Sequence, residues 1–197
     1  MPVTYTNRKG LIYYLCRGLT KTGKPRYYFA REIKDEPVEA MPPGYTISES
    51  VNGIVSLVKD RPVLIWPEEI AAVEAAVKRH PKGRNYRVSA KHNRIDVYER
   101  VGPDVEDLAA ALSYEGLLNP GLVGRLQAEE ERHGRFTAVL RFTLRLADAE
   151  KRTFGVQRMC YLGSVDDWID LSISGPLERL ARELIPKLGT DRFFDLH

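Results

Sequence analysis

The chain has 197 residues, with 30 Lys and Arg against 27 Asp and Glu. Apolar residues make up 43% of it and charged residues 29%. These proportions exclude a disordered acidic tail, a collagen-like chain and a disulfide-stapled scaffold. The chain has no long apolar run and no apolar segment near Met1, so we expect a cytoplasmic protein without a membrane partner. Cys16 and Cys160 are expected to be free thiols.

Charge alternates in sign along the chain. Residues 1–33 hold seven Lys or Arg and one acid, residues 78–100 hold eight and two, and residues 135–163 hold six and two. The segments between them carry more acids than bases. The functional prediction below rests on these basic blocks.

The first basic block favours β-strands. Its aromatic residues predict strands over residues 10–17 and 26–33, with a turn at Gly23 and Pro25. Two further strands are expected over 45–48 and 53–58, and an acidic loop over 34–40. We therefore expect residues 1–60 to form a basic, aromatic, β-rich module.

Residues 61–197 are predicted to form an α+β module, or to continue one domain with the first. Pro67 opens a helix that ends before Pro81. A hairpin follows over residues 86–100, with a tight turn in which Asn93 tolerates a positive φ. Helices are then expected from Asp104 and from Pro120.

Residues 135–147 show the clearest strand pattern, because apolar and basic residues alternate with a period of two. A second strand is expected over 152–162, where Arg158 interrupts the apolar face, and Asp166-Asp167 is expected to turn the chain into a third strand. The last helix begins after Pro176. We expect five apolar strand residues to pack on it and Arg141 and Arg145 to be solvated. The five residues are Phe136, Leu140, Phe142, Leu144 and Leu146. Together the elements predict an α+β fold, an antiparallel β-meander and hairpins packed against about four helices, with no parallel Rossmann-type sheet.

Signatures of catalysis are weak in this sequence. Lys21-Thr22-Gly23-Lys24 lacks the glycines and the following helix of a phosphate loop. The four histidines are scattered, without the spacing of zinc ligands, and Cys160 falls on an apolar strand face. We expect no catalytic residue, no metal ion and no cofactor.

Two alternatives to the leading hypothesis stay open. The charge-segregated blocks also suit a protein-interaction module or an oligomer subunit, in which Phe193 and Phe194 dock on a partner instead of the core. Asp166, Asp167 and Asp170 could hold Mg²⁺ in a metal-dependent phosphodiesterase.

The basic, Tyr-rich strands favour nucleic acid as the partner, either DNA or RNA. Lys and Arg neutralise phosphates, and flat rings stack on unpaired bases. The sequence therefore predicts a non-catalytic nucleic-acid-binding protein. The residues expected to bind are Lys21, Lys24, Arg26, Arg84, Arg87, Lys91 and Arg94 as phosphate contacts, and Tyr13 and Tyr27 as stacking platforms.

Overall fold

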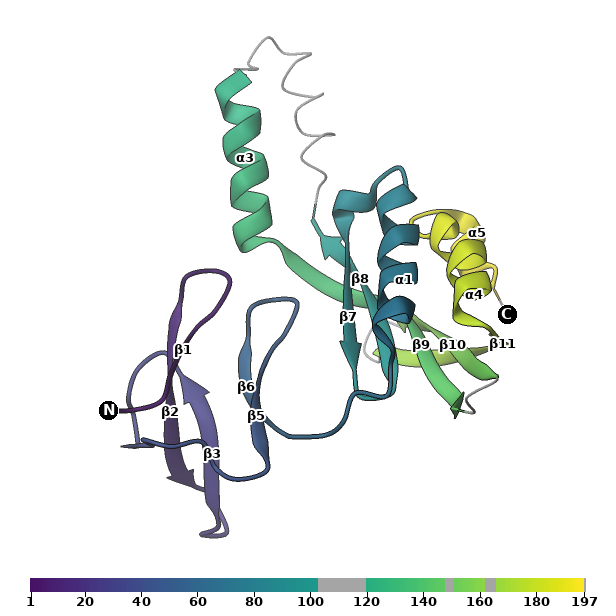
Figure 1. Ribbon diagram of the computed structural model, residues 1–197. Helices are drawn as coiled ribbons and strands as arrows, with labels where there is room; N and C mark the ends of the chain where they lie inside the picture. Colours follow the sequence, from purple (N-terminus) through teal and green to yellow (C-terminus); the bar gives the residue numbers. More distant parts are fainter. Residues whose placement is uncertain (103–119, 148–150, 162–165, 197) are drawn as a thin grey trace. The chain divides into compact units, whose positions relative to one another are not determined.

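The computed structural model describes residues 1–102, 120–147, 151–161 and 166–196 (Figure 1). The chain divides into two compact units, which are described separately. Unit 1 comprises residues 1–61 and 105–134, and unit 2 comprises residues 62–104 and 135–197. Every strand pair in the described residues is antiparallel, which confirms the α+β antiparallel prediction. The helix predicted from Asp104 lies outside the described residues.

Unit 1 contains a small sheet in the order β1-β2-β3, with β4 also paired to β2, and a separate hairpin of β5 and β6. The bounds are β1 (Thr4–Thr6), β2 (Ile12–Leu19), β3 (Pro25–Ala30), β4 (Glu36–Pro37), β5 (Tyr45–Glu49) and β6 (Val55–Lys59). Strands β3 and β6 pack together. The sequence prediction missed β1 and β4, because two or three residues are too few to show alternation. Helix α3 (Pro120–His133) ends before Gly134, as predicted.

The three hairpins of unit 1 close with the same kind of turn. Each turn begins with a short polar residue and has a glycine with positive φ three residues later. The pairs are Asn7 and Gly10, Thr20 and Gly23, and Ser50 and Gly53. In each turn the first residue's side-chain oxygen accepts a hydrogen bond from the N–H four residues later, at 2.9, 3.1 and 3.0 Å respectively. A side chain at the glycine position would strain the left-handed backbone, so glycine sets this turn.

Asn7 joins the first and third of these turns. Its side chain is buried, and Nδ2 donates to the Gly53 carbonyl at 2.6 Å. Nearby, Tyr5 Oη donates to Glu49 at 3.0 Å. These polar contacts hold the β5–β6 hairpin to the sheet, and they supplement a small apolar core around Leu15.

Unit 2 is built on a five-stranded sheet in the order β11-β10-β9-β8-β7. The strands are β7 (Tyr86–Lys91), β8 (Arg94–Val101), β9 (Arg135–Ala147), β10 (Arg152–Tyr161) and β11 (Asp166–Gly175). The helical segments are α1 (Pro67–Arg79), the 3₁₀ turn η1 (Gly83–Asn85), α4 (Leu177–Leu184), the 3₁₀ turn η2 (Ile185–Lys187) and α5 (Asp191–Phe194). Helix α1 packs on β7 and α4, and α4 also contacts β11 (Figure 1).

Two local predictions in unit 2 were wrong. Asp166 and Asp167 do not form a turn, because β11 already begins there and pairs them with Tyr161 and Cys160. In the β7–β8 turn the positive φ, +36°, falls on His92 and not on Asn93. The segment before α1 holds His92, since the Leu64 N–H donates to the His92 carbonyl at 2.6 Å.

The core of unit 2 lies between the sheet and its helices. Leu140, Phe142 and Leu144 of β9 are buried there as predicted. The helical segments contribute Val73, Leu177, Leu180, Leu184, Ile185 and Phe193, and Leu188 follows η2. Phe193 thus docks on the core, whereas Phe194 is exposed.

Two irregularities in β9 overturn the expectation for its ends. Between the pairs Thr153–Leu146 and Phe154–Leu144 the register shifts, so Arg145 is an extra residue and Leu146 moves to the outer face, where it is 48% exposed. Val139 is the extra residue on the β8 side. Phe136 is buried outside the main core, under the Arg87 guanidinium. A bulge reverses the inside–outside order of every residue beyond it.

Candidate nucleic-acid interface

The β2–β3 hairpin carries the first group of predicted binding residues. Lys21 and Lys24 lie exposed in its turn, and Arg26 is exposed at the start of β3. The Arg26 guanidinium carbon lies 5.2 Å from the centre of the Tyr28 ring. The Tyr28 hydroxyl donates to Asp35, and this hydrogen bond raises the pKa of the phenol. The structure therefore gathers three cations at one end of one hairpin.

Tyr13 and Tyr27 share one face of the same sheet. Tyr13 of β2 pairs with Tyr5 of β1, and Tyr27 of β3 pairs with Arg17 of β2. Because side chains alternate along a strand, Tyr13, Arg17 and Tyr27 project to the same side. Both predicted stacking rings are half-buried, so each keeps an accessible surface.

The β7–β8 hairpin carries the second predicted group, in unit 2. Arg87 is held within the fold, because Nη1 donates to the carbonyls of Arg84 and Tyr86 at 2.8 and 2.9 Å. Its guanidinium also lies over the Phe136 ring at 5.0 Å. Arg84 is exposed in η1, just before β7, and Lys91 is exposed at the end of β7.

Arg94 belongs to an ionic cluster on the outer face of the unit 2 sheet. Its Nε lies 3.4 Å from Oδ2 of Asp96, which is 1% exposed. Arg141 Nε donates to the other oxygen, Oδ1, at 2.7 Å, and the Arg141 guanidinium stacks 3.8 Å from the centre of the Trp168 ring. Arg94 is thus paired within the fold, although its side chain is still 37% exposed.

This cluster corrects the expectation of a solvated basic stripe on β9. The Arg141 side chain is 15% exposed, so it is part of the fold. Arg145 is 50% exposed but is paired with Asp170. The sequence analysis missed Asp96 as a partner, because its pairing with Arg141 depends on the β8–β9 register between residues 45 positions apart.

The carboxylates considered for a phosphodiesterase do not converge. Asp166 and Asp170, four positions apart, project to one face of β11, and Asp167 projects to the other. Asp170 is engaged by Arg145, and Oδ1 of Asp167 accepts the Trp168 N–H at 2.7 Å. Within the described residues there is no group of three metal-ligating side chains.

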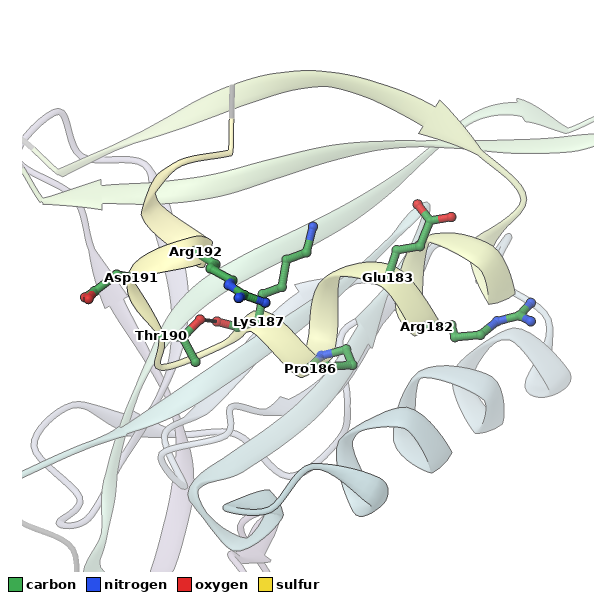
Figure 2. Close-up of a pocket in the computed structure, with 7 residues that line it drawn as sticks. All are labelled: Arg182, Glu183, Pro186, Lys187, Thr190, Asp191 and Arg192. Atoms are coloured by element: carbon green, nitrogen blue, oxygen red, sulfur yellow. Dashed lines mark hydrogen bonds between the residues drawn. The ribbon is translucent and has the colours of Figure 1, made fainter.

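A cavity of about 520 Å³ lies against α4, η2 and α5 (Figure 2). Its lining residues are Arg182, Glu183, Pro186, Lys187, Thr190, Asp191 and Arg192. Thr190 Oγ1 donates to the Lys187 carbonyl at 2.6 Å, so this hydroxyl is already engaged. The lining offers three cations and two carboxylates but no histidine or cysteine. It suits a charged ligand and provides no pair of a nucleophile and a base.

In the part of the chain that the structure describes, no helix is long and apolar enough to cross a membrane. Comparisons with protein-family models, curated proteins and solved structures find no match to this chain.

Proposed function

We propose that this chain is a non-catalytic nucleic-acid-binding protein that contacts its ligand mainly through the β2–β3 hairpin. The observation that carries the proposal is the exposure of Lys21, Lys24 and Arg26 at one end of this hairpin. In the described structure none of the three forms an ion pair. Cations that the fold does not use are the ones that can neutralise phosphates.

The aromatic face of the same sheet supports a preference for unpaired bases. Tyr13 and Tyr27 lie on one side of β2 and β3, and flat rings on a small antiparallel sheet provide stacking surfaces. Arg17 pairs directly with Tyr27, and the buried Leu15 lies between Arg17 and Tyr13 on this face. Arg17 holds Glu36 only loosely, at 3.6 Å, with both side chains exposed. An exposed pair of this kind exchanges readily for a phosphate.

The second predicted group contributes less to the proposed interface. Arg87 and Arg94 have partners within unit 2, so moving them to a phosphate would break internal contacts. Arg84 and Lys91 remain available as phosphate contacts. We therefore expect most of the binding free energy to come from unit 1.

Fluorescence anisotropy with labelled single-stranded and duplex DNA and RNA tests this function. Binding at about 50 mM salt should weaken by orders of magnitude at about 200 mM, if several phosphates are neutralised. The triple variant Lys21→Gln, Lys24→Gln, Arg26→Gln should lower the affinity at least tenfold. Tyr27→Leu should weaken single-stranded ligands more than duplexes, because it removes only stacking.

The matched control is Arg182→Gln, Lys187→Gln, Arg192→Gln, which removes the same charge from the cavity of Figure 2. It should bind nearly as well as the wild type. Equal losses in both triple variants would mean that only net charge matters, and the assigned hairpin would be incorrect. No binding by the wild type at tens of micromolar protein would contradict the function itself.

A further inference from the structure

Arg158 lies on the apolar side of the unit 2 sheet. It pairs with Leu140 of β9 and Ile169 of β11, and the same face of β10 carries the fully buried Phe154 and Val156. Arg158 itself is 9% exposed. The residue that interrupts the apolar pattern in the sequence thus remains on the buried side of the fold.

The described part of the fold provides no partner for this cation. Among the described residues Arg158 forms no ion pair, and its Nε is buried without a hydrogen bond. Arg152, on the same strand, shows the contrast, because it pairs with Glu69 at 2.5 Å and lies 4.0 Å over the Trp66 ring. A buried charge without a partner destabilises a fold, and buried charges are therefore normally paired.

We propose that Arg158 is the anchor of a binding site for a small oxyanion, a carboxylate or a phosphate. Only Nε is both enclosed and unbonded, so the two Nη nitrogens can still be reached from solvent. A guanidinium presents parallel N–H donors that match two oxygens of one oxyanion. Leu140 and Ile169 flank it with apolar surface, which strengthens an ionic contact by excluding water.

Asp167 is the carboxylate that could compete for Arg158. It projects to the same face from β11, opposite Cys160 and two pairs beyond Arg158. Its Oδ1 is held by the Trp168 N–H at 2.7 Å. A competing anion in this position would favour ligands of low charge, so a carboxylate should bind more tightly than phosphate.

The test is thermal unfolding of the full chain at pH 7 and constant ionic strength, in chloride, acetate or inorganic phosphate. The melting temperature should rise with the oxyanion concentration and reach saturation, as expected for a ligand of the native state. Arg158→Leu should abolish this rise and melt in chloride at or above the wild-type temperature. Arg61→Leu, at an exposed position, is the control and should respond like the wild type.

Arg158→Lys keeps the charge but loses the paired donors, and it serves if the leucine variant does not fold. In this variant the oxyanion concentration that gives half of the rise in melting temperature should be at least ten times higher than in the wild type. A saturating response that survives in either Arg158 variant would overturn the site, as would a wild type that responds no more to oxyanions than Arg158→Leu does. Asp167→Asn tests the alternative that Asp167, and not a ligand, pairs with Arg158. If the wild type shows no oxyanion response and Asp167→Asn destabilises the chain in chloride, Arg158 pairs with Asp167 and the proposal is wrong.

Discussion

Asp96 and Arg141 form an ion pair across β8 and β9, with 2.7 Å between Arg141 Nε and Asp96 Oδ1. The aspartate is 1% exposed, and Arg94 contacts its second oxygen. The outer face of the unit 2 sheet is therefore held by a buried carboxylate between two arginines. Breaking such a pair from one side leaves a charge that the fold cannot hydrate.

Arg141→Ala should lower the free energy of unfolding by about 3 kcal/mol, because it leaves Asp96 buried with only the longer 3.4 Å contact to Arg94. Arg145→Ala, whose partner Asp170 is exposed, should cost less than about 1 kcal/mol. Urea unfolding of the two variants measures the difference. Equal costs would mean that Asp96 gains water or another partner when Arg141 is lost.

The bulge at Arg145 predicts different costs for two leucines on one strand. Leu140→Ala should cost about 2–5 kcal/mol, because Leu140 is fully buried in the core cluster and its loss leaves a cavity. Leu146→Ala should cost less than about 1 kcal/mol, since Leu146 lies on the outer face and is 48% exposed. A large cost at Leu146, measured by urea unfolding, would contradict the register shift.

The repeated turn of unit 1 allows a matched glycine comparison. Gly23 and Gly53 have φ angles of +77° and +76°, but an added Cβ meets open space at Gly23 and lies 3.1 Å from Asn7 Nδ2 at Gly53. Gly23→Ala should therefore cost about 1–2 kcal/mol from backbone strain alone. Gly53→Ala should cost more, because it also presses on the buried Asn7 that joins two turns. Thermal unfolding of both variants tests this order, and the reverse order would contradict the contact.

Tyr86 predicts a loss of stability at alkaline pH. Burial, together with the nearby Glu99 carboxylate that accepts its hydrogen bond, raises the pKa of this phenol well above its usual value. The folded chain keeps the proton while the unfolded chain releases it above about pH 10. The contribution of Tyr86 to the free energy of unfolding is therefore fully present below pH 10. It declines as the pH rises further, by up to about 1.4 kcal/mol per pH unit.

Urea unfolding between about pH 8 and pH 11 measures this effect. Tyr86→Phe should be less stable than the wild type near pH 8 by about 1 kcal/mol, through loss of the hydrogen bond to Glu99. Its decline above pH 10 should be shallower than that of the wild type. Burial also raises the pKa of Tyr98, so Tyr98 accounts for part of the decline that remains. Parallel declines in the two proteins would show that Tyr86 ionises normally.

Local patterns determined most of the secondary structure. Alternation over residues 135–147 predicted β9 with the bounds that the structure shows, and Pro67 and Pro120 correctly marked the starts of two helices. These features depend on neighbours one to four residues apart, which a sequence displays directly. The exposed Lys21 and Lys24 followed from the same kind of signal, a glycine turn in a basic segment.

Which basic residues are free for a ligand was decided only by the tertiary structure. Arg141 and Lys24 look equally available in the sequence, yet Arg141 is paired with Asp96, 45 positions earlier in the chain. Single-residue bulges on β9 then moved Phe136 and Leu146 out of the main core. Arg158 shows the converse. The apolar pattern marked it as an exception, but only the fold shows that it is buried and has no ion-pair partner among the described residues. Strand register depends on long-range contacts. A sequence can therefore indicate where charge lies along the chain, but not which charged side chains are paired within the fold.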